Sequence, residues 1–304
     1  MKRPPSHGPQ EAPEAHWQPT VSVDPLSAIQ SLYTPVEIEP SAFPFSFADQ
    51  IVTLGSCFAE DIGRKLQVDH FALCANPFGI LYNPLSISAA LSTLRQGDSF
   101  ELEDLHFAGG RWHSWCHHTC FSHTNRHEAL QLINDHFEDG VASLARANKL
   151  FLTMGTAWLF EHQGQLVANC HGLGRDQFNR RLASVDEIVS ALEAELTVLF
   201  AANPSLSVVL TVSPVRHLRD GLVENQISKA TLILAAHKLA LALPRLEYFP
   251  AFEIVIDELR DYRFYHADLV HLTATAVDYV YGRFVEKHLT NEALSLLATV
   301  HEIA

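Results

Sequence analysis

From Ile51 onward, short apolar runs alternate with segments whose apolar residues recur at every third or fourth position. The first run, 51–54, is followed by apolar residues at 58, 62 and 66, which predicts a buried strand leading into a helix. Further runs predict strands at 71–74, 150–153, 207–212 and 246–249, and helical spacing predicts helices within 130–144, 188–199, 227–241 and 277–284. Alternating strands and helices imply right-handed crossovers and a parallel sheet covered on both faces. We therefore predict an α/β protein with a three-layer α/β/α architecture.

The two ends of the chain differ from this pattern. Nine of the fifteen prolines fall within the first 44 residues, where they disfavour helix and sheet interiors. We predict that residues 1–44 form a proline-rich, partly disordered arm, which docks where Phe43, Phe45 and Phe47 gather. Residues 45–304 are then one domain, closed by a C-terminal helix over 291–303.

Composition and charge narrow the class of protein. Hydrophobic residues make up 47% of the 304 residues and charged residues 18%, which is typical of a globular protein and not of a disordered one. The formal net charge is −14, so no excess of basic residues is available to attract a phosphate backbone or an anionic lipid surface. We expect neither nucleic acid nor a membrane as a partner.

The cysteines and the N-terminus bear on the compartment. Five cysteines without dense spacing are typical of a protein whose thiols stay reduced. The first 20 residues contain no apolar stretch of the kind found in a secretory signal. The apolar segment 231–243 is interrupted by His237 and Lys238 and is too short to span a bilayer. We expect a cytoplasmic protein.

The first predicted strand ends in a Gly-Ser turn at Gly55 and Ser56, directly before a helix. Backbone N–H groups at a helix start stabilise a developing anion, so Ser56 is a candidate nucleophile. Serine is also a preferred N-cap residue, and Ser56 could serve only to cap the helix. Cys57 is a rival nucleophile, because a helix N-terminus lowers a thiol pKa, or it is a small buried side chain.

A serine nucleophile needs a base and a group that orients the base. Asp268 and His271 are three residues apart, just before a predicted helix, so one loop could present both. With 18 histidines in the chain, this pair by itself is weak evidence for catalysis.

The segment 106–136 is rich in histidine, which raises the question of a metal. His113, Cys116, His117, Cys120 and His123 are residue types that zinc accepts. The segment alternates like a strand, however, so neighbouring candidates point to opposite faces, and no paired Cys-x-x-Cys occurs. We favour an aromatic, histidine-rich wall beside a pocket, and we predict no metal and no other cofactor.

Two further strand exits are polar. Gly155 and Thr156 follow the third predicted strand, and Arg216 and His217 follow the fourth. In parallel sheets, ligands bind beyond the carboxyl ends of the strands, so these loops are candidates for a site. A solvated loop explains the second set equally well.

Several motifs together resemble the GSCFA-domain family. They are IVTLGSCFAE from Ile51, NPFGILYNP from Asn76, WHSWCHH from Trp112, LTMGTAW from Leu152, FNRRL from Phe178 and TVSPVRHLRDG from Thr211. The resemblance runs from about Phe45 to Phe284 and leaves out only the arm and the last helix.

The GSCFA family is in turn similar to SGNH hydrolases, which implies a flavodoxin-like sheet with strand order 2-1-3-4-5. The resemblance places Ser56 at the position of the SGNH nucleophile and Asp268 and His271 at the position of its last block. Gly79 matches the first oxyanion-hole block. In the second block Thr156 replaces an asparagine, and Asn76 is a candidate substitute.

The resemblance implies a serine esterase or acyltransferase with a Ser-His-Asp triad, acting on a small-molecule or carbohydrate acyl ester such as an O-acylated sugar or polyol. Thr156 in place of asparagine favours an alternative, a catalytically inactive SGNH-like ligand-binding module. The candidate substrate-binding residues are His113, His117, His118, His171, Arg216 and His217.

Overall fold

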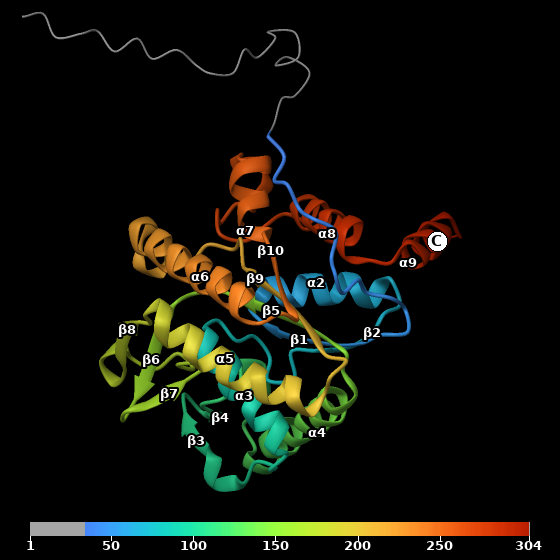
Figure 1. Ribbon diagram of the computed structural model, residues 1–304. Coiled ribbons are helices and arrows are strands. Elements are labelled where there is room, and N and C mark those ends of the chain that lie inside the picture. The colour runs from blue at the N-terminus through green and yellow to red at the C-terminus, as the bar shows by residue number, and fades with distance from the viewer. Residues whose placement is uncertain (1–33, 304) are drawn as a thin grey trace, which may run out of the picture. The chain divides into compact units, whose positions relative to one another are not determined.

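A computed structural model of the chain describes residues 34–303, and the compact unit begins at Pro35. Its centre is a parallel sheet of five strands in the order β10-β9-β5-β1-β2, which reads 2-1-3-4-5 from β2 when only these strands are numbered (Figure 1). The strands are β1 (Gln50–Gly55), β2 (Ala72–Ala75), β5 (Lys149–Met154), β9 (Ser207–Val212) and β10 (Leu246–Phe249). This is the flavodoxin-like topology, and the predicted fold class is confirmed.

Helices cover both faces of the sheet, as Figure 1 shows. One face packs against α3 (Pro84–Gln96), α4 (Arg126–Arg146), α5 (Val185–Ala202) and α6 (Leu222–Ala242). The other packs against α2 (Cys57–Val68), the short α7 (Ala251–Glu253), α8 (Ala274–His288) and α9 (Asn291–Ile303). In β1, Val52 and Leu54 contribute to the first core and Ile51 to the second, because successive strand residues point to opposite faces. The apolar runs are continuous because both faces are buried.

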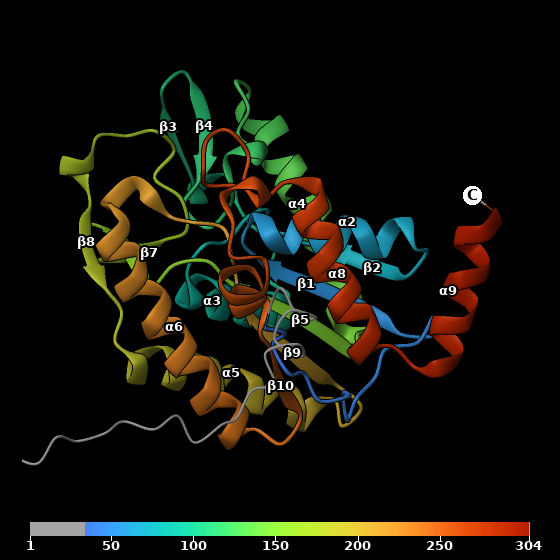
Figure 2. The same cartoon turned by 90° about the horizontal axis from the view of Figure 1, so that it is seen from above.

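Two small sheets lie outside the predicted pattern, at the end of the central sheet opposite α9 in Figure 2. The hairpin of β3 (Leu105–Ala108) and β4 (Arg111–Ser114) holds the start of the histidine-rich segment. An antiparallel sheet is built from β6 (Trp158–His162), β7 (Gln165–Val167) and β8 (Asn179–Leu182). Short helical turns complete the elements: η1 (Leu102–Asp104), η2 (Thr119–Phe121), η3 (Arg175–Gln177), η4 (Leu218–Asp220), η5 (Ile254–Leu259) and η6 (Tyr262–Phe264). The strand-like alternation that we predicted beyond Ser114 is therefore replaced by a turn and η2.

Only the last residues of the predicted arm fall within the described chain, and residues 1–33 lie outside it. The segment before Phe45 is bound to the domain by Val36, whose N–H donates to the Glu258 carboxylate at 2.5 Å. Ser41 and Ala42 both donate to the Glu247 carboxylate. Phe45 is buried edge-on against Phe284 in the core. The boundary at residue 44 stays a prediction.

The closing helix α9 agrees with the range predicted from the sequence, whereas α6 begins earlier than predicted. α9 spans the predicted 291–303, whereas α6 begins at Leu222 and not at Ile227.

Within residues 34–303, no helix has both the length and the apolar character needed to cross a membrane. The cytoplasmic location stays a prediction.

Two histidines are buried among aromatic rings, and each is uncharged in the folded protein. His117 stacks on Phe78, and its pKa is lowered to about 3 by burial first and by the charges of His171 and His136 second. His288 stacks on Phe284, and burial lowers its pKa to about 4. Both side chains are almost inaccessible to solvent.

Acid should therefore destabilise the fold well above the pH at which carboxylates titrate. Below about pH 6.5 these histidines bind protons in the unfolded chain but not in the folded chain. The free energy of unfolding therefore falls as the pH falls towards the pKa values of the two histidines in the folded protein. Each histidine contributes at most about 1.4 kcal/mol per pH unit. Urea unfolding of the wild type and of His117→Gln at pH 7 and pH 5 measures the effect, with the exposed His127→Gln as control. If the free energy of unfolding fell by the same amount from pH 7 to pH 5 in His117→Gln and in the wild type, His117 would not be the source of the acid sensitivity.

Candidate active site

Ser56 lies at the turn between β1 and α2, and the close approach of two strands fixes this turn. Gly55 has a φ of +147°, and a Cβ there would lie 2.2 Å from the carbonyl oxygen of Thr153. Only glycine fits such a position. The Gly55 N–H donates to Oδ1 of Asn76, and the Ser56 N–H donates to the Thr153 carbonyl at 3.1 Å. The strand end that carries Ser56 is therefore held from two neighbouring strands.

The Ser56 hydroxyl is not used to cap α2. Ser56 occupies the N-cap position with extended backbone angles, yet its side chain makes no capping hydrogen bond. The residue is 2% exposed, and its Oγ has no hydrogen-bond partner among the described residues. A buried hydroxyl without a partner costs free energy, which is more easily explained by a reacting group than by a structural one.

Asp268 and His271 form a hydrogen-bonded pair in the loop between η6 and α8. Oδ2 of Asp268 lies 2.7 Å from Nδ1 of His271, and Oδ1 accepts from the backbone N–H groups of Val270 and His271. These bonds, the one from the His271 side chain first, lower the pKa of Asp268 to about 2. The carboxylate stays ionised at neutral pH and holds Nδ1 of His271. The other ring nitrogen, Nε2, is then left to accept a proton, which is the arrangement that a general base requires.

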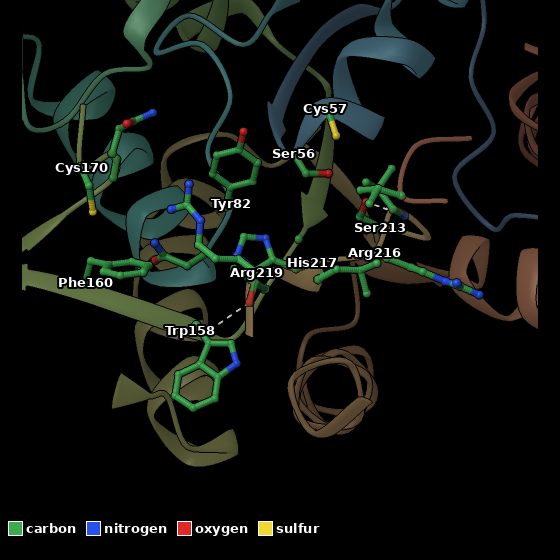
Figure 3. A pocket seen from close by; sticks show the side chains of 18 of the residues that line it. Ser56, Cys57, Tyr82, Trp158, Phe160, Cys170, Ser213, Arg216, His217 and Arg219 are labelled. Atoms are coloured by element: carbon green, nitrogen blue, oxygen red, sulfur yellow. Dashed lines mark hydrogen bonds between the residues drawn. The ribbon is translucent and has the colours of Figure 1, made fainter. Parts of the chain in front are cut away.

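The two halves line one cavity of about 760 Å³ at the carboxyl ends of the strands. Ser56 enters it from β1, Tyr82 from the loop after β2, Thr156 from the loop after β5 and His217 from the loop after β9 (Figure 3). His271 lines the same cavity, and its loop is tied to the β9 exit because the Arg216 N–H donates to the Val270 carbonyl. The fold thus places the site where parallel sheets bind their ligands.

The structure brings only some of the sequence-predicted residues to this cavity. Ser56, Thr156, Arg216, His217 and His271 line it, and Asp268 reaches it through His271.

Three others line a separate cavity of about 330 Å³, which lies beside α2: Asn76, Gly79 and His118. Asn76 acts on the first site only by fixing Gly55. The amide Nδ2 of Asn76 is buried and has no hydrogen-bond partner among the described residues. A Cβ on Gly79 would lie 2.6 Å from the Cβ of His118, so this glycine is required by the packing of the two loops.

The remaining three histidines, His113, His117 and His171, pack against other rings and are not among the residues that line either cavity. The rings of His113 and His171 are 4.4 Å apart, and His117 is buried against Phe78. His171 Nε2 is 2.8 Å from the Ser114 carbonyl, and burial lowers its pKa to about 4. Within the described part of the chain, no group of three or more His, Cys, Asp or Glu is arranged to hold a metal ion. The predicted absence of a metal stays a prediction.

The Thr156 hydroxyl is engaged within the protein. Its Oγ1 is 3.0 Å from Oγ of Ser228 and accepts from the Trp158 N–H. The side chain therefore fastens the β5 exit to α6.

The rival nucleophile Cys57 has a thiol that resists ionisation. Burial first, and the charge of Asp61 second, raise its pKa to about 11. A reactive cysteine requires the thiolate, which is scarce at neutral pH when the pKa is this high.

Lys229 of α6 lies under the site and was not found from the sequence. Its Nζ donates to the carbonyls of Gly155 at 2.7 Å and Ser213 at 2.6 Å, both of which belong to cavity-lining residues. The residue is 1% exposed, and burial lowers its pKa to about 7. A signal was present in the sequence, because Asn225, Ser228 and Lys229 share the helical spacing of the apolar Leu232 and so form a polar stripe on a buried face.

Comparison with known proteins places the chain in a family. The GSCFA family model matches residues 50–284, and the chain belongs to this family. Comparison with curated proteins gives no significant match.

Among solved structures, similar chains include a Streptococcus pneumoniae protein whose description refers to platelet activating factor, at 15% identity and a TM-score of 0.41 over 83% of this chain and 85% of that one. A Clostridium thermocellum family 3 carbohydrate esterase gives 9% identity and a TM-score of 0.35 over 83% and 98%. A family 3 carbohydrate esterase from Talaromyces cellulolyticus gives 11% and 0.27 over 52% and 65%.

Proposed function

We propose that the protein is a serine esterase or acyltransferase that acts on the acyl ester of a small molecule or carbohydrate. The observation that carries the proposal is the pairing within one cavity of an unengaged serine hydroxyl and a histidine held by a carboxylate. The serine, the histidine and the carboxylate together have the composition of a catalytic triad.

In this mechanism Oγ of Ser56 attacks the ester carbonyl carbon while Nε2 of His271 takes the hydroxyl proton. Asp268 holds the Nδ1–H tautomer and stabilises the imidazolium that forms. His271 then returns the proton to the leaving alcohol, which departs as the acyl-enzyme forms. Water or an acceptor alcohol attacks the acyl-enzyme with His271 again as base, so hydrolysis and transfer differ only in this second nucleophile.

The negative charge on the carbonyl oxygen needs donors. The Ser56 N–H is engaged by Thr153 and the Thr156 hydroxyl by Ser228. Asn83 lines the cavity next to Tyr82, and it is held because its Oδ1 caps α3 by accepting from Ser86 N–H at 2.8 Å. We assign its amide Nδ2 as an oxyanion donor, together with the N-terminal dipole of α2.

Asn83→Ser should separate the two tasks of this residue. Serine is an equally good N-cap, so stability should change little, whereas loss of the amide donor should lower kcat by about 10²–10³-fold. The control is Asn125→Ser, which changes the N-cap of α4. Steady-state kinetics on an activated acetyl ester and urea unfolding measure the two effects. An unchanged kcat in Asn83→Ser would remove Asn83 from the oxyanion site.

A second candidate function is a ligand-binding module without catalysis, which the engagement of the Thr156 hydroxyl favours. Labelling with a fluorophosphonate distinguishes the two, because this reagent reacts with a serine that a general base activates. We expect stoichiometric labelling of Ser56 in the wild type. Absence of labelling at Ser56, with the protein folded, would favour the binding module.

A further inference from the structure

The charge of the cavity is opposite to the charge of the chain. The protein carries 35 acidic and 21 basic residues. Among the described residues that line the cavity, none is Asp or Glu, whereas Arg216, Arg219, His217 and His271 are present. In a chain so rich in carboxylates, a cavity lined by two arginine residues and by no Asp or Glu among its described residues has the electrostatic character of an anion-binding site.

The two arginines differ in their surroundings. The guanidinium of Arg216 lies over the ring of Tyr265 at 4.5 Å and near the ring of Tyr262 at 5.2 Å, and Figure 3 shows it directed away from Ser56. Arg216 also ties the β9 exit to the loop of His271 through its backbone. It is therefore fixed by aromatic stacking and packing, which leaves recognition to the second arginine.

Arg219 is exposed and is directed towards Tyr82 (Figure 3). Its positive charge opposes the burial that raises the pKa values of Tyr82 and Cys170, so the guanidinium lies within electrostatic range of both cavity-lining residues. No ion pair or hydrogen bond of this side chain is found within the described part of the chain. An arginine placed in this way presents its planar donors to the cavity, where they match a carboxylate or phosphate group.

The same cavity has an apolar wall. Trp158 and Phe160 of β6 line it, and the guanidinium of Arg180 lies 3.5 Å from the centre of the Trp158 ring. Aromatic side chains with a few placed polar groups are typical of a small-molecule site.

We propose that the substrate is an anionic acyl ester, whose carboxylate or phosphate group pairs with Arg219 while the ester carbonyl lies at Ser56. This inference rests on the proposed esterase or acyltransferase function. The anion belongs to the part of the substrate that does not react, so Arg219 sets specificity and takes no part in bond making or breaking.

Two matched pairs of esters test the proposal and separate the two kinds of anion. In the carboxylate pair, mono-4-nitrophenyl glutarate is compared with 4-nitrophenyl butyrate. In the phosphate pair, 1-acetylglycerol 3-phosphate is compared with 1-acetylglycerol. The wild type should prefer the anionic member of at least one pair by about tenfold or more in kcat/KM, as expected for one charge-assisted hydrogen bond.

Arg219→Gln should remove this tenfold preference, which corresponds to about 1.4 kcal/mol. The turnover of the neutral esters should stay unchanged within about twofold, because they carry no anionic group for Arg219 to bind. Arg111→Gln, an exposed arginine of β4 that is not among the residues lining the cavity, is the matched control and should keep the preference. Ligand-detected NMR of the same esters with Ser56→Ala reads the preference in binding, without turnover.

The outcomes distinguish the two proposals. Turnover of neutral esters without preference for either anionic ester would overturn the anionic substrate and leave the esterase. Absence of turnover, with Arg219-dependent binding of an anionic ester to Ser56→Ala, would overturn the esterase and keep the anionic ligand. A preference that Arg219→Gln retains would overturn the role of Arg219.

Discussion

Ser56→Ala should abolish formation of the acyl-enzyme, whereas Cys57→Ala should leave it in place. The Ser56 hydroxyl is buried without a structural hydrogen bond and shares a cavity with His271. The Cys57 thiol, with its pKa raised to about 11, is protonated at neutral pH. Loss of a triad nucleophile lowers kcat by about 10⁶-fold in a serine hydrolase. Removing the Cys57 sulfur should mainly perturb packing.

Single-turnover acylation by an activated acetyl ester, followed by mass mapping of the adduct, measures this difference. Asp268→Asn should also be severe, since it allows the wrong tautomer of His271 and withdraws the charge that stabilises the imidazolium. In the wild type Asp268, with a pKa of about 2, is ionised at neutral pH and holds His271 in the tautomer that leaves Nε2 able to take the proton of Ser56. An acetyl group found on Cys57 in Ser56→Ala, formed at an undiminished rate, would overturn the serine mechanism.

Lys229→Met should remove a large pH dependence of stability. In the folded protein burial lowers the pKa of Lys229 to about 7, whereas an unfolded lysine titrates near 10.4. Between these values the unfolded chain binds more protons than the folded chain, so the contribution of Lys229 to stability rises with pH. The free energy of unfolding of the wild type relative to Lys229→Met should therefore increase from pH 7 to pH 9, by at most about 1.4 kcal/mol per pH unit.

A neutral amine keeps two N–H donors, which are enough for the carbonyls of Gly155 and Ser213. Lys229→Ala should therefore cost about 2–5 kcal/mol at pH 9, because it leaves a cavity and two buried carbonyls without their donor. Lys238→Met, on the same helix but exposed, is the control. Urea unfolding at several pH values measures all three variants. Equal pH dependence of Lys229→Met and wild type would show that Lys229 is charged when buried.

Local features of the sequence determined the central sheet and the two halves of the candidate triad. A fully buried strand is apolar throughout and a covering helix has a period of 3.6, so alternation of the two specified the layers before any contact was known. The loop of Asp268 and His271 is equally local, since the two side chains are three positions apart and hydrogen-bonded to each other. The Gly-Ser pair marks the end of the first strand in the sequence, although the distant Asn76 and Thr153 hold the turn in place.

The cavity itself was decided by tertiary structure. Its aromatic wall comes from β6, a strand too short and too mixed in pattern to predict, which is stabilised by pairing with β7 and β8. The period of a strand does not reveal which distant segment will cover it, and so the placement of His113 and His117 away from Ser56 could not be foreseen.

Lys229 shows the same division most clearly. Helical spacing alone places it on the buried face of α6, but its two acceptors follow β5 and β9, which are far from it in the chain. The sequence determined that a polar group would face the interior. Only the packing of α6 against two strand exits decided that this group would lie beneath the cavity, because hydrogen-bond partners that distant in sequence are chosen by the fold as a whole.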